Sequence, residues 1–144
     1  MTYLFIDPGE STGWAIFDLD GKEVGMGTCR GFENLAVWLE TWRSHDFQRV
    51  IIEEFKLYPW KSQAQLWSEF FTIEVIGAVR FKCFQFDISF EKVPARNKDI
   101  GFMYMGTTEP SHSNPLNHQL VAMAHGVYWL QTHGIRTPQQ GRTK

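Results

Sequence analysis

Acidic and imidazole side chains stand at positions where they could act together on a metal ion and a phosphate. Asp7 closes the apolar run TYLFID, and the pair Glu53-Glu54 closes the apolar run RVIIEE. His118 and His125 lie in the segment LNHQLVAMAHG near the carboxyl end. Two hard carboxylates and an imidazole suit Mg²⁺ or Mn²⁺ and leave coordination positions open for phosphate oxygens and water. The competing interpretation is an ordinary Asp-Pro-Gly turn and satisfied helix histidines.

Only one residue of the glutamate pair can face Asp7, because successive side chains of a strand point to opposite faces of a sheet. If the strands that end in Asp7 and in the glutamates are neighbours, their carboxyl ends lie together. Adjacent carboxylates repel each other unless a cation lies between them. Strand alternation alone leaves Glu53 and Glu54 as alternatives.

The two histidines share one face of a predicted helix, because a helix turns about 100° per residue and positions seven apart nearly eclipse. The position three residues after His118 lies on the same side, and it is Val121, which cannot bind a metal. The segment is therefore either part of a metal site that lacks one acid or a helix with two ordinary histidines.

Basic and aromatic residues follow the glutamate pair in FKLYPWKSQ, and further basic residues occur in VPARNKDIG. Such side chains can stack on bases and bind phosphates, although a loop with hydrophobic anchors would have the same composition. The candidate DNA-binding residues are Lys56, Tyr58, Trp60, Lys61, Arg96 and Lys98. The sequence contains no nucleophile elbow, no GxxxxGK[ST] phosphate loop and no HExxH motif.

The composition favours one domain: 144 residues with 43% hydrophobic and 15% aromatic content can bury one substantial core. Residues 1–72 carry 6 Lys and Arg against 11 Asp and Glu, whereas residues 73–144 carry 8 against 5. An acidic half that concentrates cations and a basic half that meets phosphates are compatible with DNA binding, as is a plain scatter of solvated charges.

The two cysteines, Cys29 and Cys83, form no CxxC pair, so we expect reduced thiols in the core rather than a disulfide framework or a zinc ribbon. The amino-terminal residues lack the pattern of a secretory leader, and no apolar run reaches the roughly 18 residues of a membrane span. We therefore expect no membrane partner and a cytoplasmic location, in the host cell if the protein is phage-encoded.

The elements that must position these residues form a mixed α/β pattern. Three antiparallel strands, TYLFID, GWAIFDLD and KEVGMGTC, are expected first, because Asp20-Gly21 between the last two is a strong hairpin signal. A helix in FENLAVWLETW, the strand RVIIEE, a helix over about 62–81 and the strand FDISFEKV follow. A short basic helix or loop and a last helix over about 116–132 complete a domain of residues 1–133, before a flexible basic tail of residues 134–144.

Three segments together resemble the RuvC family of Holliday junction resolvases: IDPGESTGWAIFD, VIIEEFKLYP and the last-helix pattern H-x-x-V-A-x-x-H-G. The resemblance covers about residues 1–131 and is closest to small phage-type members. It implies a ribonuclease H-like fold, an α/β fold whose five-stranded mixed sheet has helices on both faces. It also implies a structure-selective endonuclease that hydrolyses phosphodiester bonds in branched DNA with Mg²⁺ or Mn²⁺. A homodimer is implied because a four-way junction has two-fold symmetry and paired nicks need two sites.

Members of this family use an aspartate on the first strand, a glutamate on the fourth strand, and two ligands three residues apart on the last helix. The resemblance assigns Asp7, Glu53 and His118 as catalytic and metal-binding residues. It favours Glu53 over Glu54, because the family's acid directly follows the apolar strand run. Val121 stands where the family has its last aspartate, and whether His125 substitutes for that acid is left open.

Two alternatives to the nuclease follow from the departure at Val121 and from the strand-Asp-x-Gly opening. The first is a catalytically weakened protein that still binds junctions. The second is an ATP-dependent phosphotransferase-like domain of the sugar kinase and actin superfamily, although those enzymes normally enclose the nucleotide between two such domains, and 144 residues provide one.

Overall fold

A computed structural model describes residues 1–56, 60 and 63–136 of the chain, without the side chains of 64–68. The candidate residues Tyr58 and Lys61 lie outside the described residues, as does the tail segment 137–144. The elements are β1 (Thr2–Asp7), β2 (Ser11–Asp18), β3 (Glu23–Arg30), α1 (Gly31–Glu40), β4 (Phe47–Glu53), α2 (Gln63–Gln85), β5 (Ser89–Val93), α3 (Asn97–Met105) and α4 (Asn117–Thr132).

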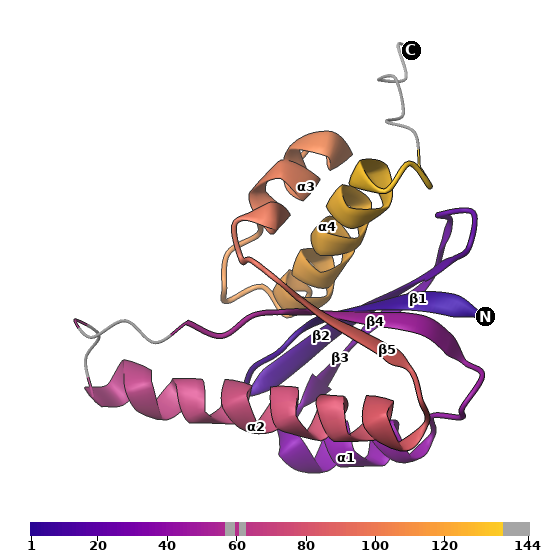
Figure 1. Cartoon of the computed structure of the whole chain (residues 1–144). Coiled ribbons are helices and arrows are strands. Elements are labelled where there is room, and N and C mark those ends of the chain that lie inside the picture. The colour runs from indigo at the N-terminus through magenta and orange to yellow at the C-terminus, as the bar shows by residue number, and fades with distance from the viewer. Residues whose placement is uncertain (57–59, 61–62, 137–144) are drawn as a thin grey trace.

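The strands form one five-stranded sheet in the order β3-β2-β1-β4-β5 (Figure 1). β1 to β3 are an antiparallel meander, whereas β4 lies parallel to both β1 and β5. The mixed sheet expected from the sequence is therefore confirmed. Because β1 and β4 are parallel neighbours, their carboxyl ends meet at one edge of the sheet.

The hairpin between β2 and β3 forms at the predicted Asp-Gly turn. Gly21 has a φ of 83°, which favours glycine, and the Oδ1 atom of Asp18 accepts hydrogen bonds from the backbone N–H groups of Asp20 and Lys22. These two hydrogen bonds therefore join residues within the turn itself.

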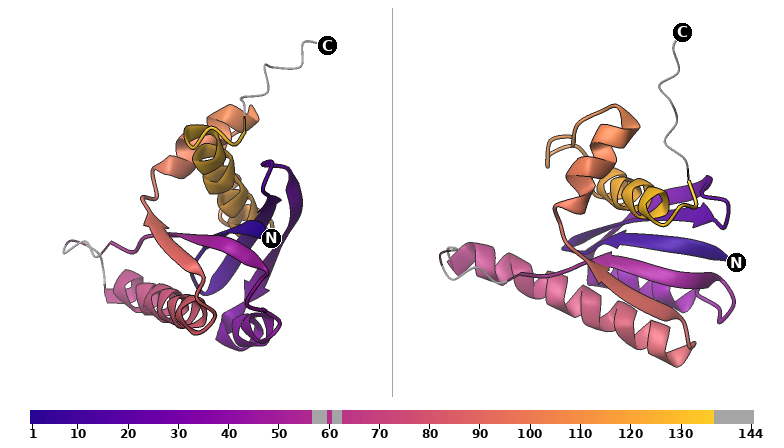
Figure 2. Two further views of the ribbon diagram at one scale, coloured as in Figure 1. Left: turned by 45° about the vertical axis from the view of Figure 1, so that its right-hand side comes forward. Right: turned by 45° about the horizontal axis from the view of Figure 1, so that its top comes forward.

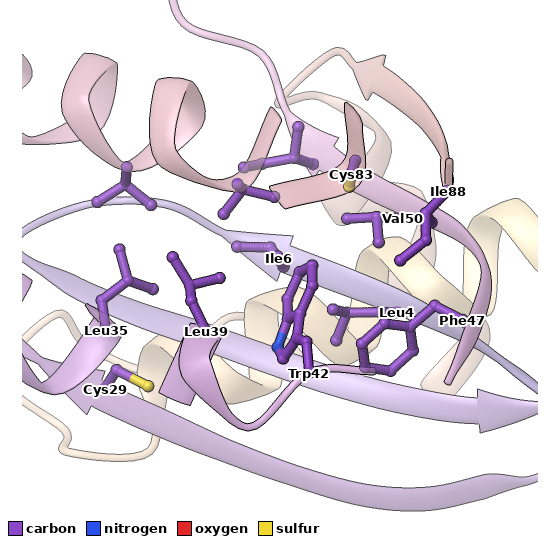
Figure 3. Close-up of a cluster of buried hydrophobic side chains, with 13 residues drawn as sticks. Leu4, Ile6, Cys29, Leu35, Leu39, Trp42, Phe47, Val50, Cys83 and Ile88 are labelled. Atoms are coloured by element: carbon purple, nitrogen blue, oxygen red, sulfur yellow. The ribbon is translucent and has the colours of Figure 1, made fainter. Parts of the chain in front are cut away.

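Helices cover both faces of the sheet. α1 and α2 pack on one face, and α3 and α4 lie on the other, as the two views of Figure 2 show. The core beneath α1 and α2 contains Leu4 and Ile6 of β1, Val50 and Ile52 of β4, and Trp42 just after α1 (Figure 3). Burial of these apolar side chains is the main source of the stability of this layer.

The opposite core contains the alternate residues of the same two strands. Phe5 of β1 and Ile51 of β4 pack against α4 residues such as Val127 and Leu130. Since side chains alternate along a strand, Asp7 follows Phe5 onto the α4 face, and Glu53 follows Ile51. The two carboxylates therefore share one side of the sheet.

The two cysteines are as expected, and two further observations concern the helices and the end of the described chain. Cys29 and Cys83 are buried free thiols. No helix among the described residues is long and apolar enough to cross a membrane. Ile135, which follows α4, packs against the core beneath that helix, and its backbone N–H donates to the carbonyl of Leu130 at 2.9 Å.

Helix α2 differs from its sequence pattern in the face that it buries. Phe71 and Phe81 lie at helical spacing, but these side chains are exposed, and Val75, Val79 and Cys83 enter the core. α2 is apolar on more than one face, so periodicity alone did not select the buried one.

Two glycines allow α4 to pack closely, one against the sheet and the other against α3. A Cβ atom at Gly13 of β2 would overlap the backbone carbonyl of His118, and one at Gly101 of α3 would overlap the carbonyl of Ala124. These two contacts fix the height of α4 above the carboxyl ends of β1 and β4.

Replacing Gly13 by alanine is therefore expected to lower the free energy of unfolding by about 3 kcal/mol, since an overpacked contact with backbone atoms cannot relax by side-chain rotation. Chemical denaturation followed by circular dichroism measures this loss. The matched control is Gly25→Ala on β3, where the nearest atom to the new Cβ is a Trp14 carbon at 3.7 Å. Equal stability of the two variants would contradict the close approach of α4.

Candidate active site

The first acid of the site, Asp7, is the last residue of β1 and is buried. The Nδ1 atom of His118 donates a hydrogen bond to its Oδ2 atom at 3.0 Å. His118 is held in place by its neighbours in the first turn of α4. The buried Asn117 donates from Nδ2 to the carbonyl of Pro110 at 2.7 Å, and Gln119 accepts from Thr28 of β3 at 3.2 Å.

The second acid of the site, Glu53, is the last residue of β4, and its side chain is 17% exposed. The Nε2 atom of His125 lies 2.9 Å from its Oε1 atom, and the His125 side chain is 2% exposed. The Nδ1 atom of His125 is buried without a hydrogen-bond partner. The imidazole therefore carries its proton on Nε2 and donates to Glu53. Burying an unpaired acceptor nitrogen costs less free energy than burying an unpaired N–H donor.

The two carboxyl groups have opposite pKa shifts. Burial, reinforced by the negative charge of Glu53, raises the pKa of Asp7 above 3.8 despite the hydrogen bond from His118. Burial also opposes ionisation of Glu53, but the hydrogen bond and charge of His125, with Lys98 and His118, lower its pKa below 4.5. The hydrogen bond to Asp7 raises the pKa of His118 above 6.5 against the effect of burial. Neighbouring acids whose pKa values shift in opposite directions are typical of functional sites.

Lys98 adds a positive charge to the surroundings of these acids. Lys98 is in the first turn of α3, and its Nζ atom lies 3.4 Å from Glu109. Burial would lower the pKa of Lys98, but the charges of Glu53, Glu109 and Asp7 raise it. Lys98 therefore remains charged and lies within the field of both site carboxylates.

Val121 is buried among apolar side chains. It is 1% exposed and packs with Phe102 of α3 and with Ala124 in a small apolar cluster. The position that carries an acid in the resembling family is part of the α3–α4 contact here.

The donor set fits a hard divalent cation held by carboxylates. Among the residues that the structure describes, no group of three or more His, Cys, Asp or Glu side chains forms a ready metal-binding cluster. Mg²⁺, however, is commonly bound through one or two carboxylates, with water and phosphate oxygens as its other ligands. Asp7 and Glu53 are close enough that the charge of one raises the pKa of the other, which is the repulsion that a bridging cation relieves.

The candidate DNA-binding residues that the structure describes are Lys56, Trp60, Arg96 and Lys98. Lys56 is exposed after β4 and pairs with Glu54 at 3.5 Å, and Trp60 is 77% exposed. Arg96 is exposed at the amino end of α3 and lines a cavity together with Lys56. Among the described members of this set, Lys98 is the one whose charge acts on the site carboxylates.

His125 is the residue whose place sequence reasoning left undecided. The spacing of seven residues from His118 was the available signal, since it places both imidazoles on one helix face. The structure shows what the spacing means: α4 packs over β1 and β2, and His118 contacts Asp7 while His125 contacts Glu53.

Comparisons with known proteins identify structures of the same fold but no relative by sequence. No protein-family model matches the chain, and no curated protein matches it significantly. RuvC of Thermus thermophilus in complex with a Holliday junction substrate matches with a TM-score of 0.65 and 15% identity, over 94% of this chain and 98% of its own. A second T. thermophilus RuvC structure gives 0.59 and 17%, over 92% and 97%.

A resolvase of fowlpox virus in complex with Holliday junction DNA matches with a TM-score of 0.52 and 15% identity, over 92% of this chain and 99% of its own. The matches extend over nearly the whole of each chain. They confirm the ribonuclease H-like fold and, at the level of fold, the resemblance to RuvC drawn from the sequence motifs.

Proposed function

We propose that the chain is a metal-dependent, structure-selective endonuclease that resolves Holliday junctions and other branched DNA in the cytoplasm, that of the host if the protein is phage-encoded. The observation that carries the proposal is the pair of acid–histidine contacts, Asp7 with His118 and Glu53 with His125, side by side at the carboxyl ends of β1 and β4. The fold shared with two resolvases whose structures hold Holliday junction DNA supports it.

Asp7 and Glu53 would hold Mg²⁺ or Mn²⁺ through the carboxylate oxygens that the histidines do not occupy. When bound there, such a cation supplies Lewis-acid stabilisation of phosphate charge and a water of lowered pKa. Glu53 is ionised at neutral pH, because its pKa is lowered, and is ready to bind a cation. Asp7 has a raised pKa in the free protein, so a cation stabilises its charged form.

The histidines act on the carboxylates from the protein side. His125 fixes the rotamer of Glu53 and is shielded from solvent, as outer partners of metal-binding carboxylates commonly are. His118 is 32% exposed, so it can reach substrate, and it serves either as a ligand or as a group that transfers a proton at Nε2, the ring nitrogen that does not contact Asp7. The two histidines, each in contact with a carboxylate, offset in part the absence of an acid at position 121.

The basic residues hold the DNA backbone. Lys98 lies beside the carboxylates and would contact the phosphate next to the cut, whereas Lys56 and Arg96 lie further out along the same end of the sheet. Trp60 is exposed and can stack on a base. Tyr58 and Lys61 belong to the same proposed surface by their place in the sequence.

A cleavage assay on a synthetic four-way junction tests the proposal. We expect nicks near the branch point in Mn²⁺ or Mg²⁺, none in EDTA, and none on linear duplex of the same sequence. Cleavage of linear and branched DNA at equal rates would contradict structure selectivity.

A second candidate function is junction binding without cleavage. The buried, apolar environment of Val121 favours it, because no acid is available there to complete a second cation site. Tight binding of the junction in Mn²⁺ with no product after prolonged incubation would favour this function over the nuclease.

We also propose that the chain is a homodimer and that α2 forms its interface. A stripe of α2 opposite the buried Val75 and Val79 carries exposed apolar side chains, with Phe81 64% and Phe84 84% exposed. The stripe is symmetric about Gly77: Phe70 and Phe84 stand seven residues to either side, and Ile73 and Phe81 stand four. Two antiparallel copies of α2 that cross at Gly77 would therefore place Phe70 against Phe84 of the partner subunit, as an isologous two-fold contact requires.

Replacing Gly77 by arginine is expected to convert the dimer to a monomer while the fold is kept. A Cβ atom at Gly77 would meet nothing within 4 Å in a single chain, whereas it would block the close approach of a second helix. Sedimentation velocity measures the change. The control is Val37→Arg, which adds the same charge at a 68% exposed site of α1. A Gly77→Arg variant that stays dimeric, or a wild-type chain that is monomeric at micromolar concentration, would contradict the interface.

A further inference from the structure

A cavity of about 410 Å³ opens beside Glu53, on the side of that residue next to Glu54. Its walls come from four parts of the chain: Pro8 after β1, the residues that follow β4, the first half of α2, and the turn from β5 to α3. Ligand pockets in proteins span roughly 300–1,000 Å³, so this volume accommodates one nucleotide.

The walls combine flat apolar surfaces with hydrogen-bond acceptors. Pro8, Phe55 and Pro94 offer planar or rigid apolar contacts, and Glu54 and Glu69 contribute carboxylates. Aromatic and apolar faces bind a base by stacking, and carboxylates accept hydrogen bonds from the amino groups of bases. A cavity with this combination suits an unpaired base better than a bare phosphate, which the carboxylates would repel.

Two cations offset the negative charge of the cavity at the side from which DNA would approach. Lys56 pairs with Glu54 at 3.5 Å, and Arg96 is exposed at the rim. These cations offset the repulsion between the acidic wall and the DNA backbone and leave a phosphate-binding edge at the entrance. The Glu54 side chain is 30% exposed and so remains accessible to a base.

We propose that this cavity receives one unpaired nucleobase with an exocyclic amino group, from a nucleotide next to the phosphate that is cut, and that Glu54 accepts a hydrogen bond from that base. The inference rests on the proposed nuclease function and gives it a source of sequence preference. A base at a branch point has lost one stacking neighbour, which lowers the cost of taking it out of the helix. Adenine, cytosine and guanine carry the amino group, whereas thymine has none, and its one donor, N3–H, lies between two carbonyl oxygens that a carboxylate repels.

The test uses four-way junctions that differ only at the nucleotides flanking the cut, each position carrying one of the four bases or an abasic sugar. Wild-type protein is expected to cut the junctions with an amino-bearing base about tenfold faster than those with thymine or no base, since one good base contact gives discrimination of that order. The variant Glu54→Gln is expected to reduce the ratio to about twofold, because an amide binds an amino group less strongly than a carboxylate does.

A second variant and a control distinguish recognition of the base from a general loss of activity. Ala95→Trp fills the cavity without changing a carboxylate and is also expected to abolish the preference. Glu33→Gln, in the first turn of α1, removes the same charge elsewhere and is expected to keep it. Binding of the same junctions in EDTA, measured by gel shift, should show the preference without cleavage.

The outcomes distinguish the two proposals. A wild-type protein that neither cuts nor binds any junction overturns the proposed function, and the inference with it. A protein that cuts junctions at the same rate whatever base flanks the cut, abasic sites included, overturns the inference alone. A preference that persists in both Glu54→Gln and Ala95→Trp shows that the base is read elsewhere and also overturns it.

Discussion

Replacing Asp7 by asparagine is expected to lower the rate of junction cleavage in Mn²⁺ by about 10³-fold. In the proposed mechanism this change removes a charged ligand and with it several kcal/mol of transition-state stabilisation, and each 1.36 kcal/mol, roughly, is tenfold in rate. The asparagine oxygen still accepts the hydrogen bond from His118, so the geometry of the first turn of α4 is kept. Single-turnover kinetics on a labelled four-way junction measures the effect, and undiminished cleavage would contradict the mechanism.

The same substitution is expected to leave the protein without cation at least as stable as the wild type. Because the pKa of Asp7 is raised in the folded state, the folded protein binds a proton more tightly than the unfolded chain does. Stability is therefore lost as the pH rises from 3.8 through the raised pKa, and ionised Asp7 destabilises the fold at neutral pH. Asparagine removes this penalty.

Thermal unfolding with and without Mn²⁺ gives a readout that does not depend on cleavage. The melting temperature of the wild type should rise with Mn²⁺ concentration, because a ligand that binds only the folded state stabilises it, and that of Asp7→Asn should not. The control is Asp20→Asn in the hairpin turn, which should behave as the wild type. A metal response in Asp7→Asn equal to that of the wild type would show that the cation binds elsewhere.

Replacing His125 by leucine is expected to lower the cleavage rate by about 10- to 100-fold, the usual cost of losing a partner that orients a metal-binding group. The loss of the hydrogen bond to a largely buried carboxylate should also lower the free energy of unfolding by about 1–3 kcal/mol. His125→Gln keeps an N–H donor and should recover part of both losses. The control is His112→Leu, which removes an exposed imidazole outside the site.

A pH profile distinguishes a positioning role of His125 from plain loss of packing. In the wild type the pKa of Glu53 is lowered, so this carboxylate stabilises the fold above pH 4.5 and the stabilisation is lost as the pH falls through the lowered value. Without His125 the pKa of Glu53 rises, and the acidic limb of the rate profile should move to higher pH. A variant with reduced stability but an unmoved acidic limb would contradict the positioning role.

Local sequence was enough for the elements and for the placement of Asp7. TYLFID is short and apolar and ends at Pro8, so it forms a strand that closes with its acid at the sheet edge. The Asp20-Gly21 turn fixes the first hairpin through contacts within five residues, Asp18–Lys22. These features depend on neighbours in the chain, and for that reason they can be read from the sequence.

Whether Glu53 or Glu54 shares a face with Asp7 depends on which face of β4 lies toward α4. β4 is apolar on both faces, so its pattern does not reveal which side meets α4. The sequence preferred Glu53 through a family resemblance, and the structure places Glu53 on the face of Asp7. The buried stripe of α2 was undecidable for the same reason, because several of its faces are apolar.

The role of His125 was decided only by tertiary packing. Helical spacing placed His118 and His125 on one face, but the distance from each to an acid depends on how α4 crosses the sheet. That crossing is set by backbone contacts at Gly13 and Gly101 between elements far apart in the sequence. The sequence by itself determined the strands, the hairpin and an acid at the end of β1, because these follow from local periodicity and turn chemistry. Asp7 and His118 are 111 positions apart in the sequence, and Glu53 and His125 are 72 positions apart. Only the fold therefore determines that each acid contacts its own histidine.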